Sequence, residues 1–267
     1  IALQNLITYG TSMMDTIMLG RADDTGTLLS ASSLANQPFF LLSLICFGLS
    51  GASLVLSSQY WGKRDLKAVR LIYSIILKAA FTISFLMAAV VLIFPEWVMG
   101  LYSNNSDIIA AGAQYLRILG WAYVFFGVEN TMLCSIRSVE LVKISVVVNM
   151  TSFCMNVFLN WVLIFGNLGA PALGIQGAAI ATLAARLSEF VITFVYLFFI
   201  DKRLRFRPKD FLLFDATMAK DLFKHGLPVL LNEMFWSLGI TMQAAILGHI
   251  SYSAGDPVAA NSIASMI

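Results

Sequence analysis

Charged residues are scarce in this sequence. Asp, Glu, Lys and Arg make up 12% of the 267 residues, against about 25% in an ordinary soluble domain. Hydrophobic residues make up 59%, and the mean hydropathy is +0.82. A soluble chain of this size would have too few polar side chains to cover its surface. The composition therefore argues against a soluble domain and predicts a membrane protein.

Cysteine and histidine are also rare, and no catalytic motif is present. The three cysteines (Cys46, Cys134 and Cys154) lie in apolar surroundings without paired spacing, which is typical of small buried side chains. His225 and His249 form no pair, and the sequence has no nucleotide-binding loop or serine elbow. We therefore expect no enzymatic activity, no metal site, no cofactor and no nucleic-acid partner.

Long stretches without any charge are present instead, at residues 25–62 and 144–185. About 20 apolar residues suffice for a helix to cross the hydrocarbon, and the ten-residue alternation of a membrane barrel is missing. The sequence predicts an all-α polytopic fold with seven spans and part of an eighth, at about 1–20, 28–60, 71–94, 108–134, 142–166, 175–200, 226–250 and from 256 onward. The second span is too long to cross upright, so we expect tilt or a kink near Pro38.

The basic residues predict the orientation of these spans. Of the 17 Lys and Arg residues, 13 fall in the connections after the second, fourth and sixth spans, and only Arg21 falls in the opposite loops. Lys and Arg accumulate on the cytoplasmic side of a membrane. The first span is therefore expected to run outward.

The longest polar stretch divides the chain. Residues 1–200 are expected to form a six-helix lobe, 201–225 a cytoplasmic linker, and 226–267 the start of a second lobe. Ile1 and Ile267 both lie inside apolar runs, without a signal peptide before the first, so we expect the chain to be truncated at both ends.

An internal repeat supports this division. Residues 17–21 (IMLGR) are similar to 245–249 (AILGH), and residues 31–35 (ASSLA) are similar to 260–264 (ANSIA). Six spans return a chain to its starting side, so a second copy would be parallel to the first. Parallel repeats with a substrate path between them are a common transporter architecture.

Six segments resemble the multidrug and toxic compound extrusion (MATE) family, in order along the chain. They are residues 14–21 (MDTIMLGR), 33–37 (SLANQ), 59–65 (QYWGKRD), 156–166 (NVFLNWVLIFG), 173–182 (LGIQGAAIAT) and 226–229 (GLPV). The resemblance implies a MATE-like bundle of twelve helices in two lobes, monomeric at full length, in the bacterial plasma membrane. This chain would be its N-terminal lobe with the start of the second.

The same resemblance implies an antiporter that exports drugs and other organic compounds, including organic cations, against an inward gradient of H⁺ or Na⁺. A lipid-linked oligosaccharide flippase of the same superfamily is an alternative. It would usually need more cavity cations than Arg117 and Arg186 to hold an anionic pyrophosphate. An intramembrane enzyme or a non-transporting membrane protein is a further alternative, against which the repeat and the missing catalytic set both argue.

Four carboxylates lie within the expected spans, where an ionisable side chain is costly and suggests a role. A carboxylate in a low dielectric can take up a proton, or hold Na⁺ or an organic cation when ionised. Asp15 matches the family's acidic residue of helix 1 implicated in cation coupling. Glu233 is the second candidate, although one branch of the family has its helix-7 glutamate one turn deeper, where Trp236 stands here.

The other two carboxylates have basic neighbours on their own helices. Glu189 is a further candidate for cation coupling, although Arg186, three residues earlier on the same face, favours a structural ion pair. Glu129 is expected to pair with Arg137 or with a neighbouring helix.

Uncharged amides also recur inside the spans, and Asn156 and Asn160 share one face of their helix. Buried amides either hold helices together or line a polar cavity with Asp15. The cavity network that we predict consists of Asn36, Gln37, Asn156, Asn160, Asn232 and Gln243.

Overall fold

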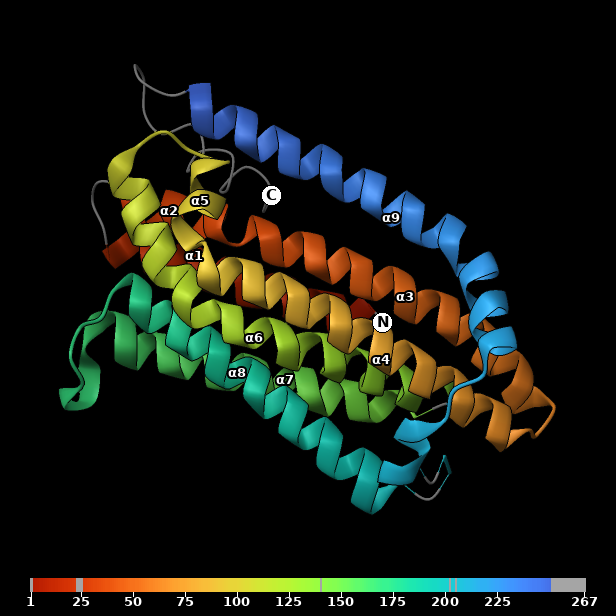
Figure 1. The fold of residues 1–267 in the computed structure, drawn as a ribbon. Helices are drawn as coiled ribbons and strands as arrows, with labels where there is room; N and C mark the ends of the chain where they lie inside the picture. Colours follow the sequence, from red (N-terminus) through yellow and green to blue (C-terminus); the bar gives the residue numbers. More distant parts are fainter. Residues whose placement is uncertain (1, 23–25, 140, 202, 205, 251–267) are drawn as a thin grey trace.

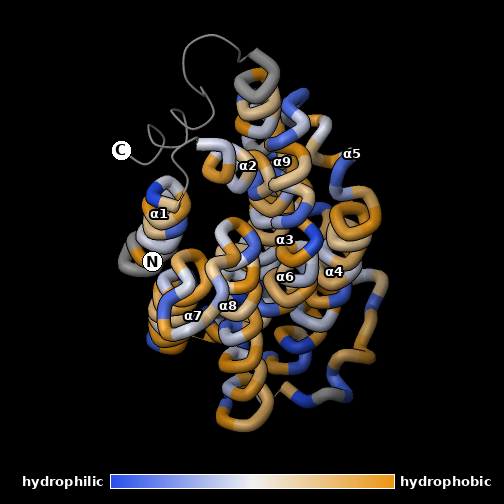
Figure 2. Tube along the Cα trace, turned by 90° about the vertical axis from the view of Figure 1, so that its left-hand side faces the viewer, coloured by the Kyte–Doolittle hydropathy of each residue, from blue (hydrophilic) through white to orange (hydrophobic). Residues whose placement is uncertain are grey.

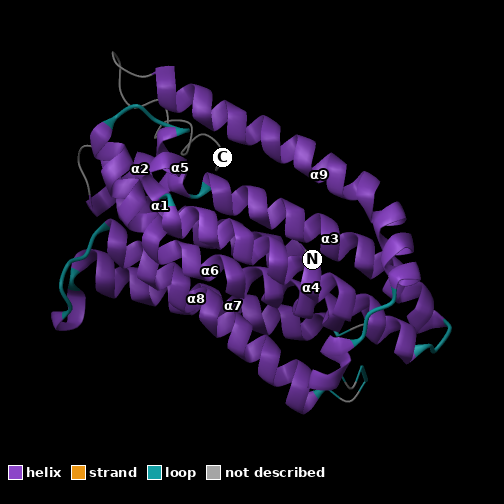
Figure 3. Cartoon of the chain, in the orientation of Figure 1, coloured by secondary structure: helices purple, strands orange, loops and turns teal. Residues whose placement is uncertain are grey.

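Helices make up most of the chain. The computed structural model describes residues 2–22, 26–139, 141–201, 203–204 and 206–250; some helical side chains, among them that of Glu233, are not described. Within those ranges the chain forms helices and loops without strands (Figure 3). In chain order (Figure 1) the elements are α1 (Ala2–Ala22), α2 (Thr27–Ala35), α3 (Gln37–Gly62), α4 (Leu66–Ile93), α5 (Pro95–Gly100), α6 (Ser106–Ser138), α7 (Val142–Phe165), η1 (Asn167–Gly169), α8 (Ile175–Val195), η2 (Tyr196–Ile200), η3 (Pro208–Leu212) and α9 (Ala216–Ile250).

Five helical stretches of the described chain are long and apolar enough to cross a membrane. They are Thr27–Gly62, Leu66–Ile93, Ser106–Ser138, Lys143–Phe165 and Ile175–Ile200. The first and seventh expected spans also correspond to helices, α1 and part of α9. However, α1 carries polar residues along its length, and the apolar part of α9 is only Met234–Ile246. The start of the eighth expected span lies outside the described residues.

The second expected span bends where α2 meets α3. Asn36 separates the two helices, and Pro38 lies in the first turn of α3. Proline has no N–H group to donate to the preceding turn, which weakens the helix at this point. Hydrogen bonds from the Asn36 N–H to Ser32 O (3.0 Å) and from the Phe40 N–H to Asn36 O (2.9 Å) carry the chain across the bend.

Helix α6 lies in the middle of the bundle (Figure 1). It packs against α4 on one side and α8 on the other; α7 packs against α8 and α1, and α9 runs along α3. Side chains such as Leu116, Leu119 and Tyr123 of α6 are fully buried in the main core.

The outside of the bundle is apolar too. Large hydrophobic side chains are exposed on several helices, including Phe85 and Ile93 on α4, Trp121 on α6 and Phe158 on α7. Figure 2 shows hydrophobic residues all around the helices rather than on a single inner face. Such a surface suits lipid rather than water.

Three basic connections meet at one end of the bundle. A buried cluster there joins Tyr73 of α4, Ile136 of α6 and Leu204 of the segment after η2. Arg70 donates from Nε to Leu204 O (2.8 Å), and Arg203 donates from Nη1 to Val139 O (2.9 Å). The connections that the basic residues predicted to share one side of the membrane therefore lie together.

Candidate functional site

A hydrogen-bonded group of polar side chains joins α1 to α7 inside the bundle. Asn160 donates from its amide nitrogen to Asp15 Oδ1 and to Asn156 Oδ1, the latter at 3.1 Å. Asn156 and Asn160 are fully buried, and the Asn160 Oδ1 atom is buried without a hydrogen-bond partner. The four-residue spacing places both amides on the face of α7 that packs on α1. The structure thus brings together Asp15, Asn156 and Asn160 as the sequence predicted.

A second charged group lies between α6 and α8. Arg186 donates from Nη1 to Glu189 Oε2 at 2.8 Å, and these side chains are 24% and 8% exposed. This is the ion pair that the three-residue spacing predicted. Arg186 also interacts electrostatically with Glu129 and with Asp15. It is therefore the positive centre of three carboxylates that belong to three helices.

Two aromatic rings lie against the Arg186 guanidinium. Its carbon atom lies 5.5 Å from the centre of the Phe39 ring and 5.4 Å from that of Phe126, and the two rings pack edge to face. Aromatic faces attract a cation, more strongly when water is excluded. The rings therefore hold the arginine in place from α3 and α6.

The amides at the α2–α3 bend lie near this region. Asn36 donates to Ser32 O (3.0 Å) and to the hydroxyl of Tyr115 on α6 (3.4 Å). Gln37 Oε1 is buried without a hydrogen-bond partner. Tyr115 interacts electrostatically with Asp15 and Arg186, which connects the bend to the two charged groups. Sequence reasoning did not single out Tyr115.

The remaining predicted site residues lie on α9, apart from these groups. Asn232 and Gln243 are exposed. Glu233 belongs to α9, but its side chain lies outside the described residues. Within the described chain α9 packs on α3, α4 and α2, and the exposed Asn232 and Gln243 are not part of the group around Asp15.

A close contact between backbones fixes α7 against α8. A Cβ atom added to Gly177 of α8 would lie 2.6 Å from the carbonyl oxygen of Leu163 and 3.1 Å from the Ile164 nitrogen on α7. Only glycine fits this position without moving one of the helices. The contact lies one turn beyond Asn160 and so helps to place its amide.

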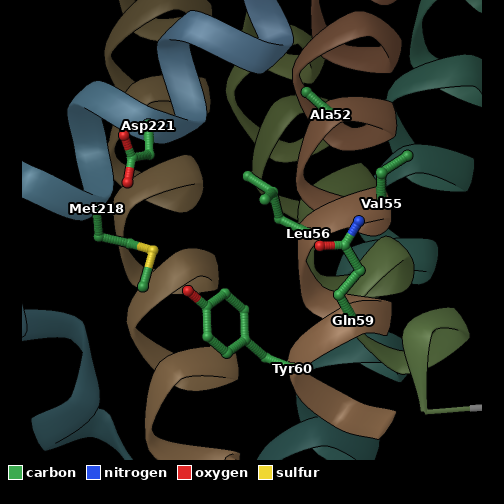
Figure 4. Close-up of a pocket in the computed structure, with 7 residues that line it drawn as sticks. All are labelled: Ala52, Val55, Leu56, Gln59, Tyr60, Met218 and Asp221. Carbon is green, nitrogen blue, oxygen red and sulfur yellow. The ribbon is translucent and has the colours of Figure 1, made fainter. Parts of the chain in front are cut away.

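A cavity among the described residues lies elsewhere, between α3 and α9. It has a volume of about 460 Å³, and Figure 4 shows Leu56 and Tyr60 of α3 opposite Met218 and Asp221 of α9. None of its lining residues belongs to the two charged groups. The buried polar groups, rather than this cavity, are therefore the candidate functional site.

The fold and the buried charges define an all-α polytopic membrane protein with ionisable groups inside its bundle. The MatE family model matches residues 1–162. The chain therefore belongs to the MatE family of multidrug and toxic compound extrusion transporters, which its motifs resemble. It is an integral, multi-pass protein of the bacterial plasma membrane.

Curated relatives and solved structures agree with this membership. A probable multidrug resistance protein NorM of Thermotoga maritima is 26% identical over 247 residues, which are 91% of this chain and 52% of the relative. The probable multidrug resistance protein YoeA of Bacillus subtilis is 25% identical over 236 residues, 86% of this chain and 49% of the relative. The chain thus spans about half the length of the curated relatives that it matches.

The structural similarity covers almost the entire chain. The MATE multidrug transporter DinF-BH matches with a TM-score of 0.85 at 18% identity, over 99% of this chain and 57% of that one. An inward-facing MATE family transporter of the MOP superfamily matches with a TM-score of 0.82 at 17% identity, over 98% of this chain and 57% of the other. At these identities the match supports the fold.

Proposed function

We propose that the full-length protein is a secondary antiporter, which exports organic cations, drugs or other xenobiotics in exchange for H⁺ or Na⁺. The observation that carries this proposal is the carboxylate of Asp15, held by Asn160 inside the bundle. Relatives named multidrug resistance proteins support the drug-exporting class.

Asp15 suits cation coupling because its partners respond to its charge. An ionised carboxylate accepts the Asn160 N–H strongly, whereas a protonated one is a weaker acceptor and gains an O–H donor. The buried, unpartnered Oδ1 of Asn160 is available to accept that proton or to contact Na⁺. Binding of the cation at Asp15 would thus change the hydrogen bonds between α1 and α7.

The proposed antiporter has two lobes, of which residues 1–200 are the first and 226–267 the start of the second. Residues 201–225 would connect them along the cytoplasmic surface. The connection is attached to the first lobe at Ser74, which donates to Leu213 O (2.8 Å), and at Lys78, which donates to the same oxygen (2.9 Å). Substrate would pass between the lobes.

The surroundings of Arg117 and Arg186 argue against the flippase alternative, which depends on these two arginines. Arg117 pairs with Glu96 at 3.2 Å on the surface, with the two side chains 61% and 70% exposed. Arg186 is held by Glu189. Neither guanidinium is left without a carboxylate, so neither suits a pyrophosphate.

The test is gradient-driven efflux of a fluorescent organic cation from vesicles that contain the full-length protein. Na⁺ and pH gradients are imposed separately, so that the coupling ion is identified by the gradient that drives efflux. We expect Asp15→Asn to abolish the response to that gradient, since the amide can neither take up a proton nor balance Na⁺.

Asp107→Asn is the matched control, because Asp107 is an exposed residue in the first turn of α6. It should leave efflux unchanged. Efflux of Asp15→Asn at the wild-type rate under the same gradient would refute the role given to Asp15. Wild-type vesicles that export no cation under either gradient would refute antiport itself.

A further inference from the structure

Glu129 of α6 is a buried carboxylate with an unsatisfied oxygen. Its side chain is 4% exposed, and Oε1 has no hydrogen-bond partner. An ionised carboxylate in such a position is strongly disfavoured unless a cation compensates it. The sequence predicted a pairing with Arg137 or with a neighbouring helix. Arg137 donates from Nε to Ser145 (3.2 Å), and the neighbouring helix α8 contributes Glu189 and Arg186.

The charged groups that face Glu129 come from two helices. Glu189 and Arg186 face it from α8, and Arg137 interacts with it from its own helix. Arg186 is committed to Glu189 by the 2.8 Å hydrogen bond. Arg137 is hydrogen-bonded to Ser145, so the guanidinium of Arg186 is the one that stands beside both buried carboxylates. Glu129, Glu189 and Arg186 together carry a net charge of −1 when both acids are ionised.

We propose that Glu129 and Glu189 form a second proton-binding site, which holds one proton between them beside Arg186. One proton makes the three groups neutral, and it removes the uncompensated charge from the buried carboxyl group whose Oε1 has no hydrogen-bond partner. Two nearby acids in a low dielectric commonly share a proton in this way, because they cannot both ionise at low cost. The site is separate from Asp15, which lies on α1.

A proton suits this site better than a metal cation. Na⁺ needs several oxygen ligands, and the positively charged Arg186 already stands beside both carboxylates. No group of three or more acidic, histidine or cysteine side chains arranged to hold a metal ion occurs in the described part of the chain. A proton needs only one acceptor oxygen, which Glu129 provides.

Arg186 connects this site to the first one, since it also interacts with Asp15. Tyr115 faces both Asp15 and Arg186 from α6. Any contribution of the second proton to transport rests on the proposed antiport function. The binding of the proton to Glu129 and Glu189 does not.

Infrared spectroscopy of the purified full-length protein at neutral pH tests the proposal directly. A protonated carboxyl group gives a carbonyl stretching band that a carboxylate lacks, and ¹³C-labelled glutamate shifts glutamate bands but not that of Asp15. We expect wild-type protein to show one such glutamate band from this site. Glu129→Gln and Glu189→Gln should each abolish it, because either remaining acid is then balanced by Arg186.

Arg186→Gln should instead increase the band about twofold, because both acids then need a proton. Asp15→Asn and the surface variant Glu96→Gln should leave it in place. The proposal is overturned if no protonated glutamate band is present in the wild type, or if the band survives both glutamate substitutions. Gel filtration shows whether each variant is folded. If one of Glu129→Gln, Glu189→Gln and Arg186→Gln is not, the other two and the labelled wild type decide.

This experiment separates the two proposals because it requires no transport. Loss of the band pattern together with Asp15-dependent efflux would refute the second site and leave antiport standing. The expected band pattern in a protein without efflux would support the second site and refute antiport.

Discussion

Arg186→Met should be among the most destabilising substitutions in the charged part of the bundle. The methionine keeps an apolar stem beside Phe39 and Phe126, but Glu189 and Glu129 lose their common cation. Breaking a buried ion pair by removing one partner costs about 3–5 kcal/mol. At 1.4 kcal/mol per tenfold, the unfolding equilibrium should shift by roughly two to three and a half orders of magnitude.

Removal of the Glu189 carboxylate should lower the free energy of unfolding by less than removal of Arg186. After Glu189→Gln the guanidinium still faces Glu129 and Asp15, and the glutamine oxygen can still accept its N–H. We expect about 1–3 kcal/mol, the usual effect of weakening a hydrogen bond to a charged group. The cost of Arg186→Met should also fall at acid pH, where the orphaned acids are protonated more easily.

The free energies are measured by equilibrium unfolding of the full-length protein in mixed detergent micelles. Arg117→Met is the matched control, because its pair with Glu96 is exposed on both sides; it should cost at most about 1 kcal/mol. The reasoning fails if Arg186→Met costs no more than Arg117→Met, or if Glu189→Gln costs as much as Arg186→Met.

Two further substitutions test the contacts of α7. Gly177→Ala should destabilise the protein by about 1–3 kcal/mol, because the new methyl group would overlap the Leu163 carbonyl. The control Gly51→Ala, with open space around it, should be neutral or stabilising by up to about 1 kcal/mol. Equal melting temperatures of the two variants would contradict the close contact. Asn160→Ala should fold, but the stimulation of its efflux by the driving cation gradient should be severalfold lower than that of the wild type. The control Thr151→Ala, on the exposed side of the same helix, should show the wild-type stimulation. An unchanged stimulation in Asn160→Ala would exclude Asn160 from coupling.

Local spacing and composition predicted the features that depend on neighbours in the chain. The long apolar runs predicted the five stretches that are long and apolar enough to span the membrane. The excess length of the second of the expected spans predicted tilt or a kink near Pro38, close to the junction of α2 and α3. The Arg186–Glu189 pair followed from a spacing of three residues on one helix face. The distribution of basic residues anticipated that three connections meet at one end.

Contacts between distant helices could not be predicted in the same way. Asp15 and Asn160 are 145 positions apart, and only their polar side chains inside apolar spans suggested a shared network. Glu129 was expected to pair with Arg137 or with a neighbouring helix, and only the packing of α6 on α8 decided that Glu189 and Arg186 face it. Its position inside an apolar span had identified it in the sequence as one of four costly carboxylates.

The sequence by itself therefore determined that this is a polytopic helical membrane protein, where its helices run and which ionisable residues they carry. Only the tertiary structure decided which of those residues share a site. The physical reason is that hydrophobicity and helical periodicity act over a few turns of one helix. The cost of a buried charge, in contrast, is set by whichever side chains other helices bring within reach: Asn160 for Asp15, and a shared Arg186 for Glu129 and Glu189.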